Sequence, residues 1–129
     1  MDKVLFVDDE GMLLEIYKGF LQDKNYEVFT ATSGKEALKI LEKKQINVMF
    51  FDLKMPGMTG LELCKKIRSF NPIALIYAVT GFTTLFELSD IRDVGFDDYF
   101  KKPVDQHFLL SVIEDSFEKL QRWNDTISK

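Results

Sequence analysis

The sequence has little of what disulfide-bonded, zinc-binding and membrane-spanning proteins need. Its 129 residues include one cysteine, Cys64, and one histidine, His107. One cysteine cannot form an internal disulfide, and it excludes the multi-cysteine zinc sites. We expect Cys64 to be a buried apolar residue of a helix and His107 to lie on the surface. The longest apolar stretches fall far short of the roughly 20 residues that span a bilayer, so no membrane segment is expected.

The chain also lacks an excess of basic residues. Seventeen lysines and arginines against 21 aspartates and glutamates give a formal net charge of −4. An acidic chain without a basic run is poorly suited to neutralise phosphates, so we expect no direct contact with nucleic acid. Asp2 and Lys3 lead directly into the first apolar run, which is not the pattern of a secretory leader. A single soluble cytoplasmic domain is therefore expected.

Five short segments have the composition of β-strands. The apolar runs at 4–7, 48–51 and 75–79 show no alternation, which is typical of strands buried on both faces of a parallel sheet. Residues 26–31 and 97–101 mix polar and apolar positions, which suits the two edges of such a sheet.

Segments with helical periodicity lie between the strands. We expect helices at about 13–20, 34–41, 60–67, 84–94 and from 105 to beyond 120. Ser33 and Glu36 have the spacing of a capping box at the start of the second helix, and Gly95 is placed to end the fourth. Strand and helix thus alternate, which requires right-handed crossovers. The sequence predicts an α/β fold: a five-stranded parallel sheet of order 2-1-3-4-5 with helices on both faces, the flavodoxin-like arrangement.

Chemically useful side chains follow the strands at their carboxyl ends, where ligands of such sheets bind. The first strand is followed by Asp8, Asp9 and Glu10, the third by Asp52, the fourth by Thr80 and Gly81, and the fifth by Lys101, Lys102 and Pro103. Carboxylates, a hydroxyl and an amine from distant parts of the chain should therefore meet at one edge of the sheet.

The electrostatics of this edge indicate a cation. Asp8, Asp9 and Asp52 repel one another, so either their pKa values rise or a cation joins them. Carboxylate oxygens suit Mg²⁺, and three carboxylates balance one Mg²⁺ and the ammonium of Lys102. Such a balanced site can accept a phosphoryl group. The alternative is that the aspartates only cap helices. That would explain a single Asp at a strand end, but it would not explain why Asp8, Asp9, Asp52, Thr80 and Lys102 all occur at one edge of the sheet.

Four motifs occur in order: FVDDE at 6–10, FDLKMPGMTG at 51–60, VTG at 79–81 and KKP at 101–103. Together they resemble the receiver domain of two-component response regulators, over nearly the whole chain, from Val4 to about Phe117. The resemblance implies a signalling phosphoacceptor rather than an enzyme. It would take a phosphoryl group on Asp52 from a sensor histidine kinase or a histidine phosphotransfer protein, and would assist that transfer and its own slow dephosphorylation.

The resemblance also implies how the phosphoryl group is bound. Asp9 and Asp52 would hold Mg²⁺ together with the backbone carbonyl of Lys54, while Asp8 would act through bound water. A carboxylate is a competent phosphoryl acceptor, and the transfer needs positioning and charge neutralisation more than an acid or a base. The Thr80 hydroxyl and the Lys102 ammonium would bind the phosphoryl oxygens.

Three further expectations concern the surroundings of the site. Tyr99 matches the family's switch aromatic, which turns inward when Thr80 is drawn towards the phosphate; a plain edge-strand aromatic is the alternative. The Lys102–Pro103 peptide bond is expected to be cis. Phe82 stands where its bulk could obstruct a hydrolytic water and so change the lifetime of the phosphoryl group.

Two positions depart from the family pattern. Thr59 replaces the usual Asp, although Thr can still cap the third helix. Phe96 follows Gly95 where a small Ala is common, so packing beneath the switch surface should differ.

Three other functions make different demands on the same residues. An aspartate-nucleophile phosphatase of the haloacid-dehalogenase type would need Asp-x-Asp after the first strand, and here the pair is adjacent. A flavodoxin would need a Ser/Thr-rich phosphate loop, whereas Asp8, Asp9 and Glu10 would repel FMN phosphate. A non-phosphorylated pseudo-receiver that serves as an interaction module stays open as the main alternative.

The last helix is longer than packing against a sheet requires. Its apolar positions recur with spacings of three and four, which is the start of a heptad seam that includes Leu110, Ile113, Phe117, Leu120, Asn124 and Ile127. We expect a receiver domain at 1–120 and a helical extension or linker at 121–129. A dimerising stalk or a connection to an effector domain is the expected use, with the fourth helix, fifth strand and fifth helix as the partner face.

Overall fold

The computed structural model describes residues 1–81 and 84–128, in which five strands and five helices alternate. The strands are β1 (Asp2–Val7), β2 (Tyr26–Ala31), β3 (Val48–Phe51), β4 (Leu75–Thr80) and β5 (Asp98–Lys101). The helices are α1 (Gly11–Leu21), α2 (Gly34–Lys43), α3 (Gly60–Arg68), α4 (Leu85–Val94) and α5 (Gln106–Ser128). Each predicted element is present, and its bounds lie close to those expected.

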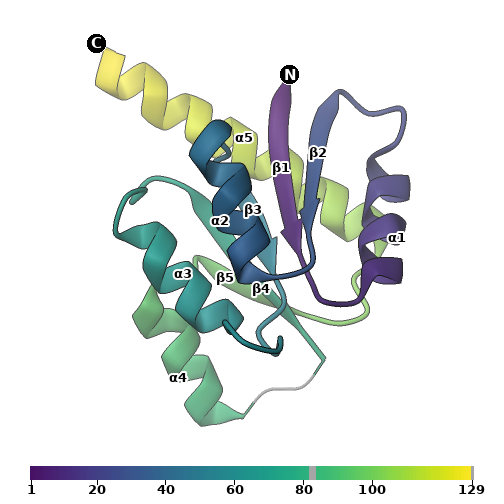
Figure 1. Cartoon of the computed structure of the whole chain (residues 1–129). Helices are drawn as coiled ribbons and strands as arrows, with labels where there is room; N and C mark the ends of the chain where they lie inside the picture. Colours follow the sequence, from purple (N-terminus) through teal and green to yellow (C-terminus); the bar gives the residue numbers. More distant parts are fainter. Residues whose placement is uncertain (82–83, 129) are drawn as a thin grey trace.

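The sheet is parallel with the order β2-β1-β3-β4-β5, which confirms the predicted topology. Helices α1 and α5 cover one face, and α2, α3 and α4 cover the other (Figure 1). Every residue of β3 and β4 is buried, whereas β2 and β5 are partly exposed at the edges. Burial on both faces is the reason that the interior strands are unbroken apolar runs.

Each face of the sheet carries its own apolar core. Under α1 and α5, Phe6 stacks on Phe50 with ring centroids 5.1 Å apart. Under α3 and α4, the ring of Phe96 packs edge to face on the ring of Phe51, with centroids 6.1 Å apart. The phenylalanine that replaces the common alanine at position 96 therefore fills part of this core. Cys64 is fully buried there, and burial raises the pKa of its thiol to about 11, which confirms its expected structural role.

The helix starts follow the predicted capping residues with one correction. Thr59 and Glu62 form a full capping box at α3, because each side chain accepts a hydrogen bond from the other residue's backbone N–H. At α2 only half of the expected box forms: Ser33 Oγ accepts from the Glu36 N–H at 3.1 Å. The Glu36 carboxylate instead accepts a hydrogen bond from the neighbouring Thr32 hydroxyl at 3.1 Å. It therefore does not bind the Ser33 N–H, as a full capping box would require.

Helix α5 extends past the sheet, as its yellow end in Figure 1 shows. Leu109 and Ile113 are buried against the strands, whereas Trp123 and Ile127 near the end are 40% and 76% exposed. His107 is exposed at the start of the helix, as expected. None of the described helices combines the length and apolar character that crossing a membrane requires.

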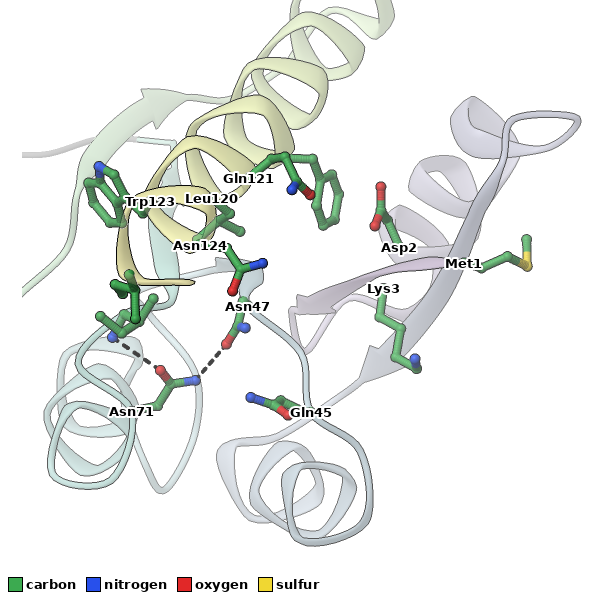
Figure 2. Close-up of a pocket in the computed structure, with 13 residues that line it drawn as sticks. Met1, Asp2, Lys3, Gln45, Asn47, Asn71, Leu120, Gln121, Trp123 and Asn124 are labelled. Atoms are coloured by element: carbon green, nitrogen blue, oxygen red, sulfur yellow. Dashed lines mark hydrogen bonds between the residues drawn. The ribbon is translucent and has the colours of Figure 1, made fainter. Parts of the chain in front are cut away.

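The end of α5 borders a groove at the edge of the sheet where the strands begin. Leu120 and Asn124, which the sequence pattern assigned to a seam, line this groove opposite Asn47 and Asn71 (Figure 2). The Asn71 amide closes the far wall by donating to Asn47 Oδ1 at 2.9 Å. Part of the predicted seam therefore faces the chain's own domain, and a dimerising stalk stays a prediction.

Candidate phosphoryl-acceptor site

Backbone pairing at the ends of the strands fixes the framework of the site. The Asp52 N–H donates to the Val7 carbonyl at 2.9 Å, so β3 stays paired with β1 up to the first site residue. The Lys102 N–H donates to the Thr80 carbonyl at 2.9 Å and joins β5 to β4 in the same way. Three of the predicted site residues, Asp52, Thr80 and Lys102, are therefore placed by main-chain hydrogen bonds that do not depend on their side chains.

Three carboxylates meet at this edge, as the sequence predicted. One oxygen each from Asp8, Asp9 and Asp52 lies within 4.8 Å of the others. Asp8 and Asp52 are only 2% and 7% exposed, whereas Asp9 faces solvent. The cluster therefore has two buried members and one that an approaching molecule can reach.

None of these three aspartates is the cap of an adjacent helix. The N-cap of α1 is Glu10, whose side chain makes no capping hydrogen bond, and the N-cap of α3 is Thr59. Asp8 does accept the Glu10 N–H at 2.9 Å, which holds its carboxylate in the loop. Helix capping therefore does not account for the cluster.

Lys102 is the cation of the site. Its Nζ donates to Asp8 Oδ2 at 2.8 Å and lies 3.5 Å from Asp52 Oδ1, and its side chain is 18% exposed. Burial alone would lower the pKa of Lys102, but the hydrogen bond to Asp8 and the charge of Asp52 outweigh it and raise that pKa. The Lys102–Pro103 peptide bond is cis, as expected.

The charges fit a divalent cation. Burial, followed by the charge of Asp8, raises the pKa of Asp52 above its ordinary value, although Lys102 and the Lys54 backbone N–H oppose this. Three carboxylates and one ammonium leave two uncompensated negative charges in a largely buried cluster. Oxygen donors with this residual charge are what Mg²⁺ prefers, so Asp8, Asp9 and Asp52 fit that ion.

Because the pKa of Asp52 is raised in the folded protein, replacing its carboxylate with a neutral side chain should stabilise the fold to an extent that depends on pH. Below the pKa that Asp52 has in the unfolded chain, its carboxyl is protonated in both states and costs nothing. As the pH rises from there through the higher pKa of the folded state, the protein loses stability, because the buried Asp52 carboxylate must carry its charge in the folded state. In excess EDTA, Asp52→Asn should therefore raise the thermal midpoint by about 2–5 °C at pH 7.5 and by much less near pH 3.5.

Thermal unfolding at both pH values measures this effect. A midpoint that is unchanged or lowered at pH 7.5 would show that Lys102 already compensates the charge of Asp52.

The remaining predicted residues lie around this cluster. Thr80 ends β4 with 2% of its surface exposed, and Tyr99 is half-buried against the core under α3 and α4. Lys54 extends its side chain to the surface, where Nζ lies 4.0 Å from Glu87 Oε1. Phe82 lies outside the described residues. The roles expected for Thr80, Tyr99 and Lys54 stay predictions.

Gly60 is the site residue that sequence patterns missed. A Cβ at this position would collide with the Asp52 carbonyl oxygen and lie 2.9 Å from Leu53 Cα. The Gly60 N–H also donates to the Leu53 carbonyl at 3.0 Å, so the first residue of α3 packs directly against the backbone segment that carries Asp52. The available signal was a glycine immediately after the capping residue Thr59, where any good helix former would otherwise serve.

A family profile and the sequence relatives of this chain point to the same family. A family profile described as the response regulator receiver domain matches residues 4–114. The regulatory protein VanR of Enterococcus faecium is 31% identical over 95% of this chain and 53% of its own length. The transcriptional regulatory protein CrdR of Helicobacter pylori is 36% identical over 80% of this chain and 49% of its own length. The chain thus spans about half the length of these relatives.

Solved structures agree with the sequence relatives. A CheY-like receiver domain protein from Methanospirillum hungatei JF-1 superposes with a TM-score of 0.89 at 31% identity, covering 95% of this chain and 98% of that one. The chemotaxis protein CheY4 of Vibrio cholerae gives a TM-score of 0.84 at 34% identity, covering 90% and 98%. The family profile, the sequence relatives and the solved structures agree, so the chain belongs to the receiver domains of two-component response regulators.

Proposed function

We propose that the chain is a Mg²⁺-dependent phosphoacceptor whose acceptor is Asp52. The observation that carries the proposal is the position of the Asp52 carboxylate, buried within 4.8 Å of two other carboxylates and 3.5 Å from Lys102 Nζ. Asp9, Asp52 and the backbone carbonyl of Lys54 would hold the ion, and Asp8 would act through bound water. When bound, Mg²⁺ would neutralise charge on the transferring phosphoryl group.

The chain's own residues then position the reaction. An Asp52 carboxylate oxygen forms a bond to phosphorus, and the bond from phosphorus to the donor's imidazole nitrogen breaks with its electron pair on nitrogen. The Lys102 ammonium and the Thr80 hydroxyl would bind the phosphoryl oxygens, with Lys102 exchanging part of its pairing with Asp8 for the new anion. Positioning and charge neutralisation of this kind carry most of phosphoryl-transfer catalysis.

The phosphoryl donor we propose is a histidine kinase or a histidine phosphotransfer protein. Apolar side chains stand on α1 next to the site: Met12 is 80% exposed and Ile16 is 45% exposed, and both follow the exposed Asp9 in the chain. Exposed apolar side chains beside a reactive centre suit a protein donor that covers the site during transfer.

The output we propose passes through Thr80 and Tyr99 to the face made by α4, β5 and α5. On α4, Leu85 is 79% exposed and Leu88 is 37% exposed, which gives that face apolar contact area. A receiver domain at 1–120 followed by an extension at 121–129 would connect this face to an effector domain or to a second copy.

Replacement of the acceptor tests the proposal. Incubation with acetyl phosphate and MgCl₂ should add about 80 Da to the wild-type chain, and Asp52→Asn should abolish this gain. Intact-mass spectrometry gives the result directly. Asp23→Asn is the matched control, because Asp23 is exposed in the loop after α1, and it should be labelled like the wild type. No gain in the wild type would favour the pseudo-receiver, a domain that binds partners without phosphorylation.

A further inference from the structure

The groove at the end of α5 lies at the edge of the sheet opposite the acceptor site. Its volume is about 530 Å³, and the start of β1, the loops before β3 and β4, and the last turns of α5 line it (Figure 2). A carboxamide offers both hydrogen-bond donors and an acceptor, so a surface rich in carboxamides can bind a copy of itself. The groove has five of them: Gln45, Asn47, Asn71, Gln121 and Asn124.

One wall of the groove is held in place by its own hydrogen bonds. Asn71 Oδ1 accepts the backbone N–H groups of Ile73 and Ala74, each at 3.1 Å. The Asn71 amide nitrogen donates to Asn47 Oδ1 at 2.9 Å, which joins the loop before β4 to the loop before β3. Because this wall is already ordered, a partner that docks on it would cost little conformational freedom there.

The charges of the groove are also self-complementary. Asp2 and Lys3, at adjacent positions of β1, are the charged side chains among the described residues that line it. The chain has a net charge of −4, so two copies repel each other on average. A patch with one acid and one base escapes this repulsion, because a two-fold axis can bring the Asp2 of each copy towards the Lys3 of the other.

Apolar side chains on the rim supply contact area. Ile127, in the last turn of α5, is 76% exposed, and Trp123, one turn earlier, is 40% exposed. Ile73 in the loop before β4 is 45% exposed, and all three line the groove. Helix α5 extends past the sheet here (Figure 1), so each copy has a projecting helix end beside its groove. Exposed apolar side chains gathered in this way mark an interaction surface.

We propose that this groove is an interface between two copies of the chain, in which the end of α5 from each copy enters the groove of the other. The contact is reciprocal, so it closes as a dimer and does not grow into a filament. It differs from a parallel coiled coil of α5 helices, because Leu120 and Asn124 line a groove of their own domain. The acceptor site takes no part in it, so the dimer should form without phosphorylation.

Sedimentation equilibrium of the unphosphorylated chain tests this interface. At about 200 μM the mass should approach twice the 15.0 kDa of one chain, as expected for a weak dimer. Ile127→Asp should weaken the dimer at least about tenfold, because its carboxylate would be buried without a partner. The exposed position of Ile127 means that the variant should fold normally, which circular dichroism checks.

Leu85→Asp is the matched control. Leu85 is 79% exposed on α4, within the face proposed for the output, and its replacement should leave the mass unchanged. A wild-type chain that stays monomeric at about 200 μM would overturn the proposal. So would a dimer that Leu85→Asp dissociates and Ile127→Asp does not, because that dimer would form through α4.

A charge exchange tests the two-fold arrangement. Asp2→Lys alone places two lysines on each patch and should weaken the dimer about fivefold. Adding Lys3→Asp restores one charge of each sign and should return the affinity to within about twofold of the wild type. A double variant as weak as Asp2→Lys would overturn the reciprocal pairing. These measurements use no phosphodonor, so their outcome is independent of the proposed function.

Discussion

Excess EDTA should slow the labelling of the wild-type chain by acetyl phosphate at least about hundredfold. The physical reason is charge: Asp8, Asp9 and Asp52 bring their oxygens within 4.8 Å of one another, and Lys102 compensates only one of the three charges. A phosphoryl group that approaches without a divalent cation therefore meets a net negative site. Intact-mass spectrometry at timed intervals follows the reaction.

Two controls accompany the chelation experiment. Adding MgCl₂ beyond the EDTA concentration should restore the original rate, which separates loss of metal from damage to the protein. Asp52→Asn should show no mass gain in either buffer. Labelling that continues undiminished in EDTA would contradict a metal site made by these aspartates.

Gly60→Ala should destabilise the fold by about 2–4 kcal/mol and slow phosphorylation with it. The added methyl group would collide with the Asp52 carbonyl oxygen and press on Leu53 Cα, 2.9 Å away. These neighbours are backbone atoms of the segment that carries the acceptor, so they cannot yield as a flexible side chain does. Urea unfolding measures the stability, and the rate of acetyl phosphate labelling measures the displacement of the site.

Gly19→Ala is the matched control for this change. Gly19 lies inside α1, and a Cβ there meets nothing within 4 Å. Because alanine has the higher helix propensity, this variant should be more stable than the wild type by about 0.5–1 kcal/mol, with an unchanged labelling rate. If Gly60→Ala behaves in the same way as Gly19→Ala, the close approach of α3 to Asp52 does not constrain the site.

The fold was predictable because burial leaves a direct trace in composition. The unbroken apolar runs at 48–51 and 75–79 are buried along their whole length, so their lack of alternation indicated interior strands. The mixed segment Tyr26–Ala31 is partly exposed along most of its length, which matches an edge. The order 2-1-3-4-5 fits these interior and edge strands together with right-handed crossovers, and the sheet has that order.

The carboxylate cluster was predictable for a related reason. In a parallel sheet the carboxyl ends of interior strands lie at the same edge, so Asp8, Asp9 and Asp52 had to converge once the strands were known. The positions of the strands did not determine which carboxylate would bind the Lys102 ammonium. Only the structure shows that its ammonium is hydrogen-bonded to Asp8 at 2.8 Å and lies farther, at 3.5 Å, from Asp52.

Contacts that depend on tertiary distance were beyond the sequence patterns. Arg68 and Asp97 are 29 residues apart and each looks like an ordinary surface charge, yet the Arg68 guanidinium pairs with Asp97 Oδ2 at 2.8 Å and also donates to the carbonyl of Gly95, the residue that ends α4. The capping box predicted at Ser33 was half wrong, because Thr32 competes for the Glu36 carboxylate in a way that spacing alone does not reveal. The groove beside Asn124 likewise arises from how far α5 passes the sheet.

The identity of the phosphorylated residue tests the central claim most directly. The chain is labelled with acetyl phosphate and MgCl₂, reduced with borohydride to convert an acyl phosphate into a stable alcohol, digested and sequenced by tandem mass spectrometry. The structure predicts one modified residue, Asp52, which is buried beside Asp8 and Lys102. A modification on Asp8 or Asp9, or a phosphate on a hydroxyl residue that borohydride leaves intact, would contradict it.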